Sequence, residues 1–284
     1  MRTRALRRSA GRKAMRNKWL AAPYVGWMAL FVVAPLVLVV VYALTTRDGA
    51  FTLDNFSSML QYASVFGRSF LLAGIATVLC ILLGYPMAYF LARERGRLRS
   101  MAMLLIMLPM WMNFLLRTYS WVFLLERNGF FNTLLSTIGL PKLDIINTEA
   151  AVVLGMVYNF LPFMVLPIFS VIVKIDPRVI EAAQDLGANS VQVFRRVIFP
   201  LSLPGVLSGV TMVLIPSVST FVISRLLGGG KSLLLGDLIE MQFLGSAYNP
   251  HLGSAISLVM MVIVLVCMGI MNRFGEGEEE AVLL

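Results

Sequence analysis

Few residues of this 284-residue chain have a type and spacing that could support chemistry. The stretch GGGKS, Gly228 to Ser232, has the composition of the end of a phosphate-binding loop. Such a loop needs another Gly five positions before its last Gly, so that backbone N–H groups surround the phosphates, and Arg225 stands there instead. Cys80, Cys267 and the single histidine, His251, lie far apart without metal-ligand spacing. We therefore predict no catalytic residue, no metal site and no cofactor bound by this chain.

The composition accounts for this scarcity, because it is that of a membrane protein. Hydrophobic residues make up 58% of the chain and charged residues 14%, with a mean hydropathy of +0.82, which lies outside the range of soluble globular proteins. Uncharged windows of nearly the ~20 residues that a helix needs to cross a bilayer recur along the chain. They are Trp19 to Thr46, Ser69 to Ala92, Ser100 to Leu116, Ala150 to Val173, Val197 to Ser224 and Leu252 to Asn272. We predict an all-α integral membrane protein with six transmembrane helices.

The third window is short, and we expect its helix to continue past Arg117. At 1.5 Å per residue, Arg117 would lie about 27 Å from Ser100, near the far interface, where its side chain can extend into water. Prolines lie in or beside most windows, which lipid tolerates where neighbouring helices or water satisfy the freed carbonyls. Kinked helices that pack on one another favour a transporter over a simple anchor.

Basic residues indicate the orientation of these spans. An even number of spans places both termini on one side, and 17 of the 24 Lys and Arg residues lie on that side, which the positive-inside rule makes cytoplasmic. The same rule places the loop of residues 176–200 in the cytoplasm. We interpret the net charge of +9 as this topological signal and predict no nucleic-acid partner. The first apolar run is too long for a signal-peptide core, so we read it as an uncleaved span.

The chain divides into three parts. Residues 1–68 hold a basic cytoplasmic arm, the first transmembrane helix and the first outer loop, and residues 69–273 hold the other spans. Residues 274–284 form an acidic cytoplasmic tail that we expect to be disordered. On the outer side, GFFNTLLSTIGL spaces its apolar residues at near-helical intervals, which fits either a short interfacial helix or buried packing.

A charged stretch, EAAQDLGANSVQVFRRVIFP, interrupts the apolar windows. Asp176 and Pro177 form a helix N-cap and first-turn pair, and Gly187 can end that helix in the left-handed conformation. Ser190 can cap a second helix, and Pro200 marks where that helix should give way to the next span. We interpret this segment as a rigid hairpin suited to mechanical coupling with a soluble motor.

The hairpin also carries a recognisable motif. Its Glu181, Ala182, Ala183, Gly187 and Pro200 resemble the EAA motif in the cytoplasmic loop of membrane subunits of ABC-type importers. That motif reads EAA, three residues, Gly, nine residues, Ile, one residue, Leu, Pro, and this chain has Val and Phe in place of the Ile and Leu. The two small alanines leave a narrow face that could enter a groove on a partner. The chain is most similar to the spermidine/putrescine permeases, through RTYSWVFLLERNG, YNFLPFMVLPIF and FVISRLLGGGKSLLLGDLIEMQF.

This resemblance implies a fold, a set of partners and a function. It implies the ABC importer type I permease fold over residues 69–273, with residues 176–200 as the ATPase-coupling loop. Mg-ATP would be used by two cytoplasmic ATP-binding subunits, not by this chain. The other implied partners are a homologous second permease subunit, an extracytoplasmic substrate-binding protein and the lipid of a bacterial-type inner membrane. Closure of the ATPase pair would move the coupling loops and reverse access to a path for polyamines.

A path for a polyamine should offer carboxylates and aromatic faces to several positive charges. The candidates by position are Glu126, Asp237, Glu240, Trp121 and Tyr158. Asp237 and Glu240 would share a face if LLLGDLIEMQFL is helical. Each acid could instead be a solvated surface charge, Trp121 an interfacial belt residue and Tyr158 a packing residue.

Three other functions make different demands on the sequence. An ABC importer permease for another small solute fits the same motif. An ATPase-independent secondary transporter would need ionisable groups at the membrane midplane, and apart from Arg117 the windows hold none. A membrane-embedded hydrolase would need clustered His, Asp or Ser partners, and His251 stands alone in the sequence.

Overall fold

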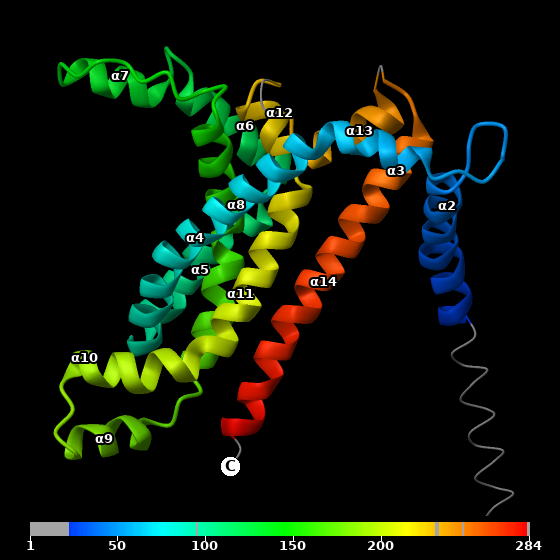
Figure 1. Cartoon of the computed structure of the whole chain (residues 1–284). Helices are drawn as coiled ribbons and strands as arrows, with labels where there is room; N and C mark the ends of the chain where they lie inside the picture. The colour runs from blue at the N-terminus through cyan, green and yellow to red at the C-terminus, as the bar shows by residue number, and fades with distance from the viewer. Residues whose placement is uncertain (1–22, 95, 231–232, 246, 283–284) are drawn as a thin grey trace, which may run out of the picture. The chain divides into compact units, whose positions relative to one another are not determined.

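The computed structural model describes residues 23–94, 96–230, 233–245 and 247–282, and the regular elements in these ranges are all helices. Figure 1 shows their arrangement. The elements are η1 Ala29–Val33, α2 Ala34–Ala43, α3 Asp54–Met59, η2 Leu60–Tyr62, α4 Ala63–Arg93, α5 Arg97–Trp111, α6 Phe114–Leu125, α7 Phe130–Thr137, α8 Glu149–Ile172, α9 Pro177–Asp185, α10 Ser190–Val193, η3 Phe194–Ile198, α11 Phe199–Ser219, α12 Val222–Leu227, α13 Leu235–Leu244 and α14 Pro250–Val282. They form two compact units, one of described residues up to 60 with 249–259, the other of residues between 61 and 248 with 260–282.

The smaller unit is held together by contacts at the end of its first apolar helix. The Asn55 side-chain amide donates a hydrogen bond to the carbonyl of Ala43 at 3.0 Å. The ring nitrogen Nδ1 of His251 lies 3.1 Å from the carbonyl of Tyr42, and the two rings meet edge to face with centroids 5.2 Å apart. His251 thus has a structural contact within its unit, since its ring covers the last turn of α2.

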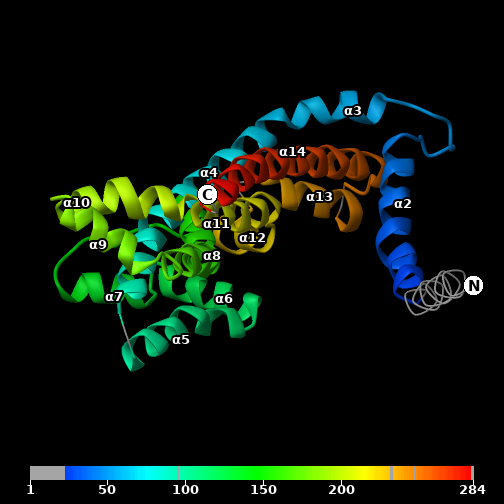
Figure 2. The ribbon, with the colours of Figure 1, turned by 90° about the horizontal axis from the view of Figure 1, so that it is seen from below.

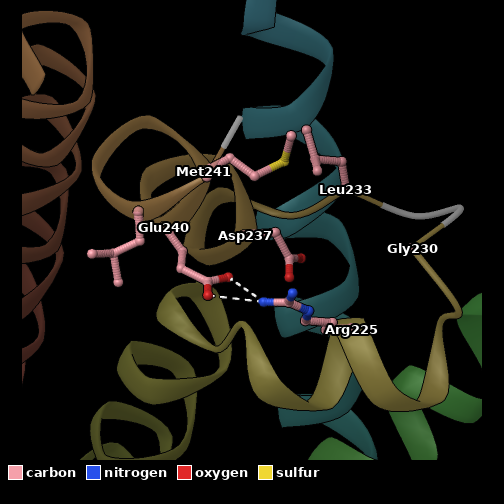
Figure 3. Close-up of a pocket in the computed structure, with 8 residues that line it drawn as sticks. Arg225, Gly230, Leu233, Asp237, Glu240 and Met241 are labelled. Carbon is pink, nitrogen blue, oxygen red and sulfur yellow. Dashed lines mark hydrogen bonds and ion pairs between the residues drawn. The ribbon is translucent and has the colours of Figure 1, made fainter. Parts of the chain in front are cut away.

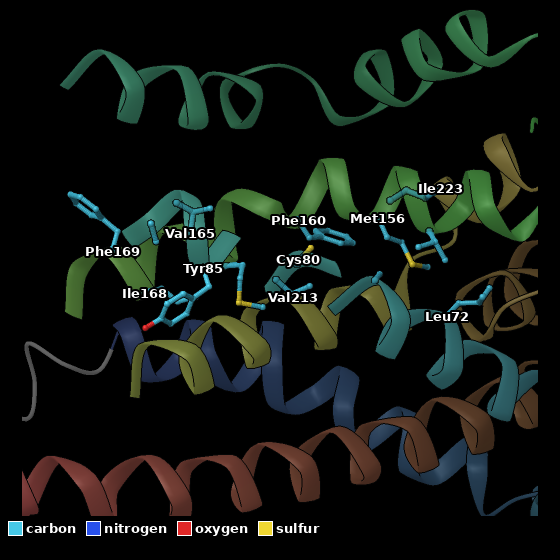
Figure 4. Packing of buried hydrophobic residues seen from close by; sticks show 14 of the residues in the cluster. Leu72, Cys80, Tyr85, Met156, Phe160, Val165, Ile168, Phe169, Val213 and Ile223 are labelled. Atoms are coloured by element: carbon cyan, nitrogen blue, oxygen red, sulfur yellow. The ribbon is translucent and has the colours of Figure 1, made fainter. Parts of the chain in front are cut away.

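Three long helices, α4, α8 and α11, form the core of the larger unit (Figures 1 and 2). The central α8 is apolar on nearly every face, as expected of a helix surrounded by others, and it buries Met156, Val165 and Ile168 (Figure 4). The hydroxyls of Tyr85 and Ser202 lie 2.7 Å apart and join α4 to α11. This bond gives the buried Tyr85 hydroxyl a partner, and the Ser202 hydroxyl also donates to the carbonyl of Phe199 at 2.9 Å.

Glycines allow α11 to approach α8 closely. A Cβ atom on Gly205 would lie 2.9 Å from the carbonyl oxygen of Pro167, and one on Gly209 would lie 2.7 Å from the sulfur of Met164. Residues four apart lie on one face of a helix, so the two glycines form a stripe of small residues. Membrane helices use such stripes because close van der Waals packing must replace a hydrophobic driving force that is absent in lipid.

Two groups of short helices lie at opposite ends of this core. Figure 1 shows α9 and α10 at one end and α7, α12 and α13 at the other. The sequence predicted that the loop of residues 176–200 and the two acids Asp237 and Glu240 lie on opposite sides of the spans, and the structure agrees with that prediction.

The described helices account for five membrane spans, or six if one bent pair is a single span. Helical segments long and apolar enough to cross a membrane are Pro23–Ala43, Asp54–Arg93, Glu149–Ile172, Ser190–Ser219 and Pro250–Met271. The bent pair is Arg97–Trp111 with Phe114–Thr137, at an angle of 96°. The predicted number of spans is reached only by counting that pair as one.

The third predicted window was wrong in its geometry, because it does not hold one continuous helix. Asn113 leaves the helical conformation and its side chain caps α6, accepting hydrogen bonds from the backbone N–H groups of Leu115 at 2.9 Å and Leu116 at 3.4 Å. Arg117 therefore lies in the first turns of a new helix, and it is 7% exposed where an extended, solvated side chain was predicted. Its guanidinium lies 5.9 Å from the ring of Phe114, and Nε and Nη1 have no hydrogen-bond partner among the described residues.

Two smaller features concern the acidic tail and the outer side. The helix α14 runs into the acidic tail and ends at Val282, and the expected disorder of that tail stays a prediction. Glu is a good helix former, and adding a turn to an existing helix avoids the cost of nucleation. The apolar side chains Phe130 and Leu134 of α7, and Ile138 directly after it, are exposed. This exposure fits the interfacial interpretation of that helix and not the alternative of buried packing.

Candidate functional site

The hairpin at residues 176–200 has the predicted first helix. The Asp176 side chain accepts a hydrogen bond from the N–H of Arg178 at 2.9 Å and caps α9, with Pro177 in the first turn. Gly187 has φ +83° and ends the segment. In that conformation the N–H of Ala188 reaches the carbonyl of Ala183 at 3.0 Å, which satisfies one of the free carbonyls at the helix end.

The second half of the hairpin differs from the prediction. Asn189, not Ser190, caps α10: its side chain accepts from the N–H of Gln192, and the Gln192 side chain accepts from the N–H of Asn189, both at 2.9 Å. An amide cap with Gln three residues later is a capping box, which the sequence NSVQ contained. Pro200 does not end the helix either. It lies in the first turn of α11, directly after the π-helical segment η3, whose wider turn admits the missing N–H.

The surface of the hairpin is partly apolar. Glu181 and Ala182 are exposed, whereas Ala183 is half-buried against the core, so only one of the two alanines lies on the free face. Leu186 is 90% exposed beside the turn, and Val191 is 72% exposed on α10. Exposed apolar side chains on a polar, well-capped hairpin mark a surface suited to another protein.

Asp237 and Glu240 lie together at the opposite end of the unit (Figure 3). The segment is helical as predicted, and both acids line a cavity of about 410 Å³ with Arg225 and Met241. The guanidinium nitrogen Nη1 of Arg225 contacts both carboxylate oxygens of Glu240, at 2.8 and 2.9 Å. Sequence reasoning missed this partner, which comes from α12 and is separated by a loop.

Asp237 is part of the framework of this cavity. It is only 8% exposed, and its Oδ2 lies 2.6 Å from Ser224 Oγ and 3.1 Å from the N–H of Leu234, so it joins α12 to the start of α13. Burial raises the pKa of Asp237 above its usual value, and the hydrogen bonds from Ser224 and Leu234 only partly offset this effect. Ser224 Oγ also lies 2.9 Å from the carbonyl of Phe221. The Ser224 hydroxyl carries one proton, which these two acceptors, Asp237 Oδ2 and the Phe221 carbonyl, share.

The aromatic candidates meet in a different place. The rings of Trp121 and Tyr158 lie edge to face with centroids 5.2 Å apart, and Phe131 stacks on Trp121 at 6.2 Å. Trp121 and Tyr158 line an open groove of about 690 Å³ between α6, α4 and α8. Glu149, in the first turn of α8, lines the same groove and pairs with Arg68 of α4. Neither Glu149 nor Arg68 was among the predicted site residues.

The remaining candidate, Glu126, lies apart from both the cavity and the groove. Glu126 is exposed at the end of α6, and its backbone carbonyl accepts the N–H of Gly129 at 2.8 Å. Gly229 and Gly230 have left-handed backbones, while Lys231 and Ser232 of the GGGKS stretch lie outside the described residues, as does the basic arm. The five predicted path residues are therefore divided among a cavity, a groove and the surface.

These features describe a multi-span helical membrane protein with a well-capped, partly apolar hairpin at one end of its larger unit. The profile of the family described as "Binding-protein-dependent transport system inner membrane component" matches residues 80–276. The chain belongs to this family and is a multi-pass inner-membrane transport component.

Named relatives and solved structures agree with this assignment. The chain is 41% identical over 248 residues to the spermidine/putrescine transport system permease protein PotB of Haemophilus influenzae, covering 84% of this chain and 86% of that protein. It is 39% identical over 250 residues to PotB of Escherichia coli K12, covering 84% and 90%. The fold matches the crystal structure of a bacterial ABC transporter involved in the import of alginate, with a TM-score of 0.74, 20% identity and coverage of 92% of this chain and 98% of that one.

Proposed function

We propose that this chain is a permease subunit of an ATP-driven importer of polyamines of the spermidine and putrescine type. Two relatives named for that transport share 41% and 39% of their aligned residues with it, over 84% of its length. In this proposal the chain itself hydrolyses nothing. It supplies half of a membrane path, and Mg-ATP is used by separate subunits.

The observation that carries the proposal is the separation of two unlike surfaces in one unit. At one end, the α9–α10 hairpin exposes Leu186 and Val191 around a turn fixed by Gly187. At the other, carboxylates and aromatic rings line the cavity and the groove. A permease that is driven by a separate ATPase subunit needs this division. The ATPase must contact one end of the permease while the cationic substrate is received at the other.

The partners follow from the same division. Two cytoplasmic ATP-binding subunits would contact the hairpins of this chain and of a homologous second permease subunit. A substrate-binding protein outside the membrane would deliver the polyamine near Asp237, Glu240, Trp121 and Tyr158. The orientation, with both termini and the hairpin in the cytoplasm, rests on the positive-inside rule.

Reconstitution tests this function. The chain would be co-expressed with the second permease and the ATPase encoded beside it, placed in liposomes, and supplied with the binding protein and radiolabelled spermidine or putrescine. We expect uptake that requires ATP and every subunit. Uptake of a different small solute under the same conditions, with none of either polyamine, would favour the alternative cargo. Polyamine uptake without the ATPase would indicate a secondary transporter.

A further inference from the structure

The groove between α4, α6 and α8 combines three features that suit one class of ligand. Trp121 and Tyr158 supply aromatic rings in contact, Glu149 supplies a carboxylate, and the remaining wall is apolar, with Leu79, Leu83 and Val157 along its length. Ammonium groups bind carboxylates and aromatic faces, and the methylene chain between two ammonium groups packs on apolar walls.

We propose that Glu149 forms a binding subsite for one ammonium group of the transported amine, that the rings of Trp121 and Tyr158 receive another part of the same amine farther along the groove, and that Arg68 is a built-in cation which the substrate displaces. This proposal rests on the proposed function, since it takes the cargo to be a polyamine. It assigns the binding role to Glu149 and the competing role to Arg68.

The contact between Arg68 and Glu149 is open enough to be exchanged. The side chains of Arg68 and Glu149 are 45% and 41% exposed, and both contacts of the guanidinium go to the same oxygen, Oε1 of Glu149. An exposed ion pair contributes little net stability, so an arriving ammonium group replaces the guanidinium at small cost. Glu149 also lies in the first turn of α8, where the helix N-terminus favours negative charge.

The other acidic pair is a weaker candidate for the same role. Arg225 holds both oxygens of Glu240, whose side chain is 25% exposed, and none of the described residues that line that cavity is aromatic. Asp237 beside it is engaged in hydrogen bonds that join two helices. The groove therefore offers a cation the more accessible carboxylate and the only aromatic rings of the two described sites.

Two substitutions distinguish a subsite from an ordinary ion pair. In the reconstituted complex, the KM for spermidine and for putrescine would be measured for Glu149→Gln and Arg68→Gln. Glu149→Gln should raise KM about tenfold, the scale of one charge-assisted hydrogen bond. Arg68→Gln should lower KM, because the competing cation is gone. A purely structural ion pair predicts a different pattern. Either substitution breaks the same contact, so both should change KM in the same direction.

Controls keep the result specific. Glu149→Asp retains the charge and should stay nearer to the parent than Glu149→Gln. Asp144→Asn disrupts the exposed pair of Arg127 and Asp144, joined at 3.8 Å, outside the groove, and should leave KM unchanged. Equal shifts in the same direction for both groove variants, or a shift for Asp144→Asn as large as that for Glu149→Gln, would overturn the proposal. Absence of polyamine uptake by the intact parent complex would instead count against the proposed function.

Discussion

Replacing Gly187 with Val is expected to weaken the binding of the ATPase without removing the chain from the membrane. Gly187 has φ +83°, and a Cβ atom built there meets nothing within 4 Å. The substitution therefore introduces backbone strain without a steric clash, and a left-handed conformation costs a β-branched residue about 1–2 kcal/mol. That energy shifts the population toward other turn conformations by a factor of roughly 5–30, which would separate Leu186 from α10.

The assay compares recovery of the ATPase subunit with membrane level and uptake. Gly187→Val should reduce ATPase recovery and uptake together, while Gly187→Asn should lose less, because Asn tolerates the left-handed region. Gly139→Val is a matched control, since Gly139 has φ +78° with open space around it, at the end of α7. Normal ATPase recovery and uptake by Gly187→Val would refute the reasoning, and so would an equal loss with Gly139→Val.

Further predictions concern the framework. Asp237→Ala should lower the stability of the purified complex by about 1–3 kcal/mol through lost buried hydrogen bonds, whereas Asp237→Asn, whose amide oxygen can accept from both Ser224 and Leu234, should stay nearer to the parent in a thermal melt. The pKa of Asp237 in the folded protein is raised above 3.8. Its stabilising contribution is therefore complete below that pH and is lost as the pH rises through the folded pKa. Asp237→Asn should remove this part of the pH dependence of the melting temperature, and an unchanged pH profile would contradict this prediction. Gly205→Val should destabilise the complex by about 1–3 kcal/mol, because its Cβ would lie 2.9 Å from the Pro167 carbonyl oxygen. Gly74→Val is the control and should not destabilise it, because a Cβ there meets no atom within 4 Å. Similar melting temperatures for the two variants would count against close packing of α8 and α11.

The features that local signals determine were predictable from the sequence. Long uncharged windows, the Asp176–Pro177 cap and the left-handed Gly187 depend on a few neighbouring residues. The structure confirms the cap, the left-handed Gly187 and five of the six windows. The break at Asn113 depends on a local cap as well, but the apolar run on both sides concealed it.

The composition of the candidate site could not be predicted in the same way. Arg68 pairs with Glu149 across 81 positions, and Trp121 meets Tyr158 only because α6 packs beside α8. Asp237 and Glu240 look equivalent in sequence, yet one is a buried framework residue and the other a partly exposed ion-pair partner. Such differences arise from the packing of helices far apart in the chain, which residue types and spacing do not encode locally.

Site-directed cross-linking tests most directly that the α9–α10 hairpin couples this permease to its ATPase. Leu186→Cys would be introduced into a chain in which Cys80 and Cys267 are replaced by Ala. Ile138→Cys, directly after α7 and also exposed, is the control from the opposite end. In the assembled complex, we predict that a bifunctional thiol-to-amine reagent joins Leu186→Cys, but not Ile138→Cys, to the ATPase subunit. Capture of the ATPase by Ile138→Cys, or its absence from Leu186→Cys in a complex that still co-purifies, would contradict the account.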